Sequence, residues 1–96
     1  MKAALSAWRS IEPDVFEHEP TDAEVVAKAR RRVDESGWYA DARPWHLGGY
    51  MGAVWAGDPP LWIVPMWAAT EDEALAGAYV EALRIEFERE PEQRSP

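Results

Sequence analysis

The residues that could carry acid–base or metal chemistry in this chain are few. The two histidines are His18, in an acidic segment, and His46, beside Trp45 in an aromatic segment. Because the chain has no cysteine, a zinc site would need both histidines together with carboxylates, and their spacing matches no metal motif. A single histidine in a loop more often packs or forms a hydrogen bond than acts as an acid or base. We therefore predict no catalytic residue, no metal ligand and no cofactor.

Serine and glycine patterns add no motif for catalysis or phosphate binding. None of the four serines follows a nucleophile-elbow pattern. The glycines of the segment GGYMG, residues 48–52, lack both the lysine and the following helix of a phosphate loop, so they predict turns and bulges. With 18 Asp and Glu residues, neighbouring carboxylates occur by abundance alone and indicate no specific site. A noncatalytic protein is the expectation.

The aromatic segment between residues 38 and 50 holds the remaining candidates for a binding site. They are Trp38, Tyr39, Arg43, Trp45, His46 and Tyr50. Trp, Tyr and Arg side chains are enriched where proteins contact each other, and aromatic rings can also form a cage for a cation, a planar ring or a sugar. The leading hypothesis is a regulator, adaptor or inhibitor that binds a protein partner through its aromatic surface or its acidic C-terminal helix. The alternative is a small-molecule-binding protein with an aromatic pocket around residues 38–50.

Length and composition place these candidates on one small domain. The 96 residues fit a single α+β domain over residues 1–90, followed by a flexible C-terminal tail over residues 91–96. The lack of cysteine, of a signal segment and of a spanning segment predicts a cytoplasmic protein without membrane contact. The net charge of -8 argues against direct nucleic-acid binding, because phosphate contacts depend on Lys and Arg.

Two helices are predicted from their capping signals. Thr21 and Glu24 match a capping box, and the helix after them should end near Gly37; its narrow apolar stripe suits close packing against a sheet. Thr70 and Glu73 match a second capping box.

The helix after Thr70 should run to about Arg89, before Pro91. Its predicted apolar face is Leu75, Ala76, Tyr79, Val80, Leu83 and Phe87. Residues 1–20 are ambiguous, although residues 1–10 could form a short helix.

A tryptophan-rich β-hairpin is the strongest strand prediction. The runs YMGAVWA and LWIVPMWA are rich in aromatic and β-branched residues, and the turn formers GDPP separate them. A four-residue loop would pair Ala56 with Leu61, and therefore Trp55 with Trp62. In the same register Val54 pairs with Ile63, Gly52 with Pro65, and Tyr50 with Trp67. A third strand is plausible over residues 38–42.

The predicted fold is a small antiparallel sheet packed by two helices in the order α-β-β-β-α. This order resembles that of double-stranded RNA-binding modules in topology only, because no motif of that family is present and acidic charge replaces the basic surface that RNA needs.

Both faces of the predicted hairpin are apolar, so both need a cover. At about 25 cal/mol per Å², exposing two Trp side chains would forfeit about 8 kcal/mol, which is comparable with the stability of a whole domain. The C-terminal helix can cover one face. The other needs residues 1–20, the segment 38–47 or a second copy of the chain, and a homodimer is favoured because a two-fold arrangement could also pair the exposed strand edge with its twin.

Overall fold

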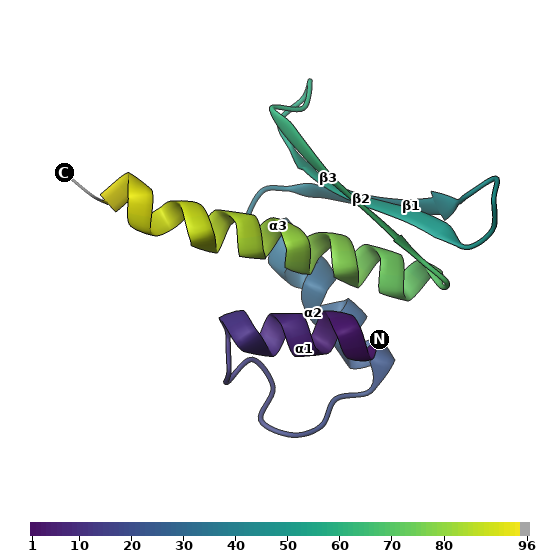
Figure 1. Ribbon diagram of the computed structural model, residues 1–96, viewed down its shortest axis with the longest axis horizontal. Coiled ribbons are helices and arrows are strands. Elements are labelled where there is room, and N and C mark those ends of the chain that lie inside the picture. Colours follow the sequence, from purple (N-terminus) through teal and green to yellow (C-terminus); the bar gives the residue numbers. More distant parts are fainter. Residues whose placement is uncertain (95–96) are drawn as a thin grey trace.

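Three helices and a three-stranded antiparallel sheet make up the fold, in the order α-α-β-β-β-α (Figure 1). The computed structural model describes the backbone of residues 1–94 and the side chains of residues 1–88. The elements are α1 (Lys2–Ile11), α2 (Asp22–Glu35), β1 (Tyr39–Pro44), β2 (Tyr50–Ala56), β3 (Trp62–Ala68) and α3 (Glu71–Arg94). The α+β class and the third strand are confirmed. The prediction of only two helices is wrong, because the ambiguous N-terminal segment forms α1.

Helix α3 is the central layer of the molecule. It contacts every other element, with the sheet on one side and α1 and α2 on the other (Figure 1). Seven side chains of its first half are buried: Ala74, Leu75, Ala76, Ala78, Tyr79, Val80 and Ala82. The sequence predicts one apolar face, but the helix is buried on two sides because its alanines let neighbouring elements approach closely.

The second half of α3 extends past the sheet and past α1 (Figure 1). Phe87, which we expected on the buried face, is therefore 52% exposed. The helix also continues to Arg94, beyond the predicted end near Arg89. The predicted tail over residues 91–96 thus begins inside α3, and residues 95–96 lie outside the described residues.

Helix α1 covers the side of α3 that faces away from the sheet. Trp8 is completely buried, and its ring lies edge-on to Phe16 and Tyr79, with ring centroids 5.6 and 5.2 Å away. Four residues after Trp8, the Glu12 carboxylate accepts hydrogen bonds from both terminal Arg32 guanidinium nitrogens at 2.8 and 3.0 Å and from the Trp8 indole N–H at 3.3 Å. This carboxylate joins α1 to α2, and the Arg32 guanidinium holds the pKa of Glu12 below its usual value.

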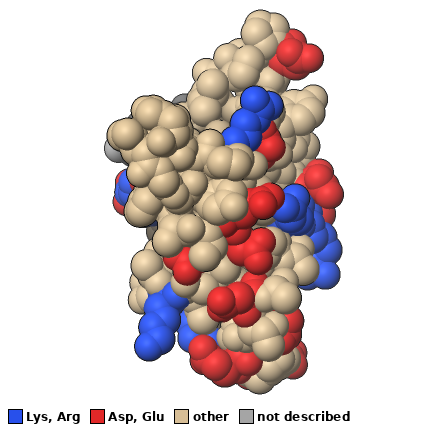
Figure 2. Space-filling view, turned by 90° about the vertical axis from the view of Figure 1, so that its right-hand side faces the viewer, with Lys and Arg blue, Asp and Glu red and all other residues tan. Residues whose placement is uncertain are grey.

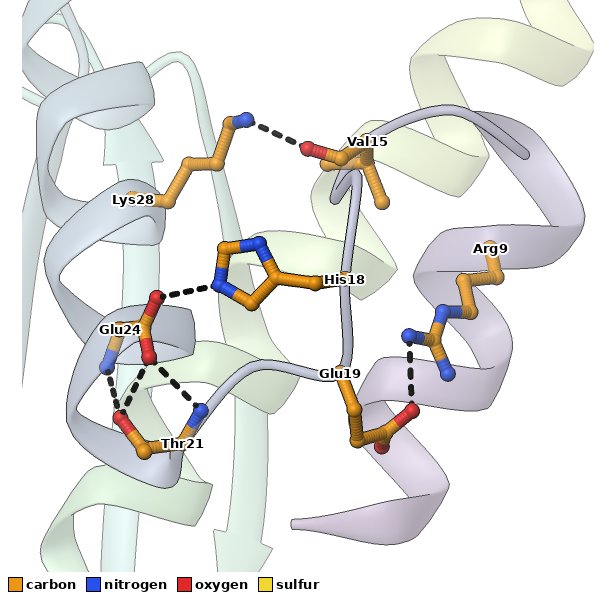
Figure 3. Close-up of polar contacts among 7 residues, drawn as sticks. All are labelled: Arg9, Val15, His18, Glu19, Thr21, Glu24 and Lys28. Carbon is orange, nitrogen blue, oxygen red and sulfur yellow. Dashed lines mark hydrogen bonds and ion pairs between the residues drawn. The ribbon is translucent and has the colours of Figure 1, made fainter.

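Helix α2 packs mainly on α3 and meets the sheet at β1, so the close packing against a sheet that its narrow stripe suggested is the smaller of its contacts. Its predicted capping box is confirmed: the Thr21 hydroxyl accepts from the Glu24 backbone N–H, and the Glu24 carboxylate accepts from the Thr21 N–H (Figure 3). The Thr21 backbone N–H and hydroxyl both donate to the Glu24 carboxylate, and these hydrogen bonds lower the pKa of Glu24.

Side chains also tie the segment between α1 and α2 to both helices (Figure 3). His18 reaches the Glu24 carboxylate at 3.3 Å, and Glu19 reaches Arg9 of α1 at 3.2 Å. Lys28 of α2 donates a hydrogen bond to the Val15 carbonyl. His18 thus serves a surface contact within the helical layers.

The start of α3 has half of its predicted capping box. The Thr70 hydroxyl accepts from the Glu73 backbone N–H at 3.2 Å, as expected. The Glu73 carboxylate instead meets the N-terminal ammonium of Met1 at 2.8 Å. An opposite charge brought close by the fold has drawn this carboxylate away from the Thr70 N–H, and the contact ties the first residue of the chain to the central helix.

The hairpin of β2 and β3 has a register one residue away from the predicted one. Ala56 pairs with Trp62 instead of Leu61, and Trp55 pairs with Ile63. Pro59 and Pro60 have no N–H to close the turn, so Leu61 closes it by donating to the Ala56 carbonyl at 2.7 Å. Because Ala56 pairs with Trp62, the loop has five residues, 57–61, and the shift moves every β3 side chain to the other face relative to β2.

The true register gives one face of the sheet to α3. On this inner face lie Val54 and Val64, paired with each other and both buried, and Gly52 opposite Met66. A Cβ atom on Gly52 would lie 2.3 Å from the Ala74 carbonyl oxygen, so β2 approaches the backbone of α3 too closely for any side chain. Gly52 serves this close approach, and it does not face Pro65 as the predicted register would have it.

Candidate functional site on the outer face of the sheet

The face of the sheet that points away from α3 consists of nine side chains in three rows across the strands. We call it the outer sheet face. Its rows are Tyr39–Trp55–Ile63, Asp41–Ala53–Pro65 and Arg43–Met51–Trp67. In each row the first residue comes from β1, the second from β2 and the third from β3. Seven of the nine side chains are apolar or aromatic, so strand alternation here does not produce a polar solvent face.

Within residues 1–94, no helix or loop covers the outer sheet face. Ile63 is 57% exposed, Trp67 53% and Tyr39 49%. Residues 1–20, which we considered as a cover, pack on the far side of α3 through Trp8 and Val15. The prediction that both faces of the hairpin are apolar is confirmed, although the register changes which residues share a face.

The exposed aromatic side chains are held in place by contacts within the sheet. The Trp67 indole N–H donates to the Gly48 carbonyl at 2.9 Å, and the ring lies over Gly49, where a Cβ atom would be only 2.6 Å from it. Tyr39 stacks on Trp55 with ring centroids 5.8 Å apart and planes 22° apart. Rings ordered in advance lose little conformational entropy when a partner covers them.

Charge is scarce on the outer sheet face. Its ion pair joins Arg43 Nε to the Asp41 carboxylate at 2.7 Å, and both residues belong to β1. The part of the molecule where the sheet lies is mostly uncharged, whereas acidic and basic side chains gather over the helices below it (Figure 2). The net charge of -8 therefore belongs mainly to the helical layers and leaves this face close to neutral.

The six predicted site residues do not meet at one place. Tyr39 and Arg43 lie on the outer sheet face. Trp45 and His46 lie in the turn between β1 and β2, with ring centroids 4.6 Å apart. Tyr50 begins β2 and has the inner-face position opposite Ala68.

Trp38, the sixth, points to the helix side, 5.0 Å from Trp62 and 6.2 Å from Tyr79 between ring centroids. It lines a cavity of about 320 Å³ between β3 and α3, together with Trp62, Ile63, Val64, Ala82, Ile85 and Glu86. Sequence reasoning missed Trp55, Ile63 and Trp67 as site residues because it assigned them only to the packing of the hairpin.

The acidic C-terminal helix offers less surface than expected. The middle of α3 is buried between the sheet and the other helices, so its accessible side chains lie in the first turn and after residue 84. In its projecting half, the Arg84 guanidinium contacts the carboxylates of Glu81 and Glu88, and its contact with Glu81 lowers the pKa of that carboxyl. The Arg84 cation thus offsets one of these two negative charges within the helix.

A second cavity, of about 600 Å³, lies between the start of α1, the end of β3 and α3. Its wall is mostly apolar, from Ala4, Met66 and Gly77, with Glu73 and Glu81 among the few charged residues. In the described part of the chain, no three His, Asp or Glu side chains lie close enough together to hold a metal ion. Across the same residues, no helix combines the length and apolar character needed to cross a membrane.

Among the described residues, the outer sheet face is therefore an apolar surface that the structure leaves open, with ordered rings and balanced charge. Comparison with protein-family models, with curated proteins and with solved structures finds no match for this chain.

Proposed function

We propose that this chain is a noncatalytic protein-interaction module that binds its partner through the outer sheet face. The observation that carries the proposal is an ordered aromatic surface with nothing over it: Trp67, Trp55 and Tyr39 are each held by a neighbouring group of the sheet. A regulator, adaptor or inhibitor needs such a surface and needs no catalytic group.

The free energy available at this face supports the proposal. A buried Trp covers about 150–250 Å², so the exposed half of Trp67 amounts to roughly 100 Å². At about 25 cal/mol per Å², covering it would contribute about 2.5 kcal/mol. Ile63 and Tyr39, which are about half exposed, would add to this. Trp and Tyr are among the residue types that interface hot spots favour.

The direct test is photo-crosslinking in cells that produce the protein. A benzophenone amino acid replaces Ile63 on the outer sheet face in one variant and Arg31 on α2 in the other, since both positions are exposed. We expect covalent adducts with a protein from position 63 and few from position 31. Adducts that are equally frequent at both positions, or absent at position 63, would overturn the proposal.

The small-molecule alternative retains one supporting observation. The cavity beside Trp38 has about 320 Å³, at the lower end of the range for ligand pockets, and indole rings line part of it. Its test is a screen of metabolite mixtures followed by the indole N–H signals in NMR spectra. A ligand of this cavity should shift the Trp38 and Trp62 signals and leave that of Trp67 unchanged. If no mixture shifts them, the alternative fails.

A further inference from the structure

We infer that the partner of the outer sheet face is a second copy of this chain, packed face to face about a two-fold axis. This inference rests on the proposed function, because it names the occupant of the same surface. Three properties of the face favour this occupant: the blocked β3 edge beside it, the alternation of large and small side chains, and the order of its two charges.

The free edge of β3 is unsuited to pairing with another strand. The Ala56 carbonyl points toward β3, where it accepts from Leu61. Along a strand, the backbone N–H and C=O groups of successive residues point alternately to its two sides. Those of Trp62 and Val64 therefore point toward β2, and the Pro65 nitrogen points toward the free edge. Pro65 has no N–H to donate and sits at the centre of the strand, so it interrupts any added ladder. The β3 edge therefore does not provide the strand pairing that we expected in addition to a covered face, and we place the second copy on the face of the sheet.

Large and small side chains alternate along each strand of the outer sheet face. On β2, Met51 is followed by Ala53, and on β3, Pro65 is followed by Trp67. A two-fold axis that passes across the strands between these two rows sets Met51 against Ala53 of the second copy. The same axis sets Trp67 against Pro65 of the second copy. Large residues then meet small ones on both strands, as the inner faces of two packed sheets require.

The same axis also matches the charges. Asp41 lies in one of the two rows and Arg43 in the other. The rotation that brings the rows together therefore places each Asp41 opposite Arg43 of the second copy. A face with one positive and one negative charge is complementary to itself, whereas a strongly basic partner would call for excess negative charge here. The remaining negative charge stays on the helical layers, away from the contact (Figure 2).

The small area of the outer sheet face predicts a dimer that exchanges with the monomer. Three strands spaced about 4.8 Å apart and seven residues long give a face of about 14 by 20 Å, or roughly 300 Å² in projection. Standard interfaces bury about 800 Å² per partner. The axis lies between two of the three rows and not through the centre of the face. The Tyr39–Trp55–Ile63 row therefore faces the turn between β1 and β2 of the second copy, where Trp45 is 39% and Leu47 80% exposed, and this adds contact area. We therefore expect a dimer that forms at about 100 µM and dissociates on dilution.

The experiment uses charge reversal and remixing. Asp41→Lys makes both charges of the face positive and Arg43→Glu makes both negative. Either change alone should lower the association constant at least about tenfold, because like charges then meet across the axis. An equimolar mixture of the two variants should restore the dimer as a heterodimer, which native mass spectrometry distinguishes by mass.

The chain provides matched controls for these variants. Arg31 and Glu35 of α2 form an exposed ion pair at 3.7 Å on the helical side, so Arg31→Glu and Glu35→Lys change the net charge by the same amounts. They should leave the association constant within about twofold of the original. All four variants should fold, because exposed ion pairs contribute little to stability; circular dichroism checks this.

The outcomes separate this inference from the proposed function. A chain that stays monomeric at about 100 µM, or a mixture that does not restore the dimer, overturns the second copy as the occupant. The proposed function survives that result if position 63 still crosslinks to a different protein. Conversely, a dimer with no crosslink from position 63 would mean that the copies meet elsewhere, and both proposals would fail.

Discussion

The two faces of the sheet are built from the same strands and are both apolar, yet they differ in what lies against them. The inner face has small residues in β2, including Gly52, and α3 packs onto it at backbone distance. The outer face has larger rings, including Trp55 and Trp67, and nothing in residues 1–94 covers it. An apolar composition therefore does not distinguish a core face from a contact face. The two faces are distinguished by the size of their residues, because small residues let the backbone of α3 approach and larger rings do not.

The largest test of this difference compares neighbouring positions on β2. Gly52→Val should destabilise the fold by about 3 kcal/mol, because the new side chain would collide with the Ala74 carbonyl group of α3, which cannot move away as a flexible side chain can. Ala53→Val, on the outer face, should change the free energy of unfolding by less than about 0.5 kcal/mol. Urea denaturation followed by circular dichroism measures both. Similar losses would remove the distinction between the faces.

Truncating one apolar side chain on each face gives the next largest effect. Val54 is fully buried, so Val54→Ala should cost about 2 kcal/mol at any protein concentration. Ile63 is 57% exposed, and Ile63→Ala should cost less than about 0.5 kcal/mol in dilute solution. Melting curves at several concentrations check the pair. A concentration-independent loss of 2 kcal/mol for Ile63→Ala would show that the outer face is already covered within the chain.

Acid should weaken the helical layers before the sheet. The pKa of Glu12 is lowered by Arg32, so the stability it contributes is present above its ordinary value near 4.5 and is lost as the pH falls through the lowered pKa. Glu12→Gln should cost about 1 kcal/mol at pH 7 and almost nothing near pH 2. Denaturation curves across this pH range test the prediction. A loss that is independent of pH would contradict the role of the carboxylate charge.

The smallest predicted effect concerns the order of the outer face itself. Trp67→Phe removes the indole hydrogen bond to the Gly48 carbonyl, which is exposed to water, so the cost in stability should be about 0.5 kcal/mol. The free ring should then reorient faster, and NMR relaxation of the aromatic side chain detects this motion. Tyr39→Phe keeps the stack on Trp55 and should change neither quantity. Equal mobility at position 67 in both proteins would contradict anchoring by the hydrogen bond.

Local signals predict much of this fold. Thr21 with Glu24 marks the start of α2, and the two aromatic runs around GDPP mark the strands of the hairpin. Helix α1 is harder to predict, because no side chain caps its start and its buried residues are only Leu5 and Trp8. The hairpin register is harder still, since the sequence is compatible with a loop of four and a loop of five residues, and only the observed pairing of Ala56 with Trp62 distinguishes them.

The candidate site is likewise predicted in part by local sequence signals and decided in part by contacts that these signals do not show. Patterning shows that both sides of the hairpin are apolar, but a shift of one residue exchanges the neighbours of Trp55 and Trp62. The segment 38–50 predicts a site by composition, yet the strands send its side chains to opposite faces of the sheet.

The sequence by itself determines the class of the fold, the positions of two helices and the hairpin, and an excess of apolar surface on that hairpin, because these depend on propensity, capping and alternation over a few residues. Tertiary structure alone decides which face α3 covers, that α1 packs on α3 and not on the sheet, and that Tyr39, Ile63 and Trp67 remain exposed. Those outcomes depend on contacts between residues far apart in the chain, where a glycine opposite a helix backbone or a carboxylate beside a distant guanidinium settles the arrangement.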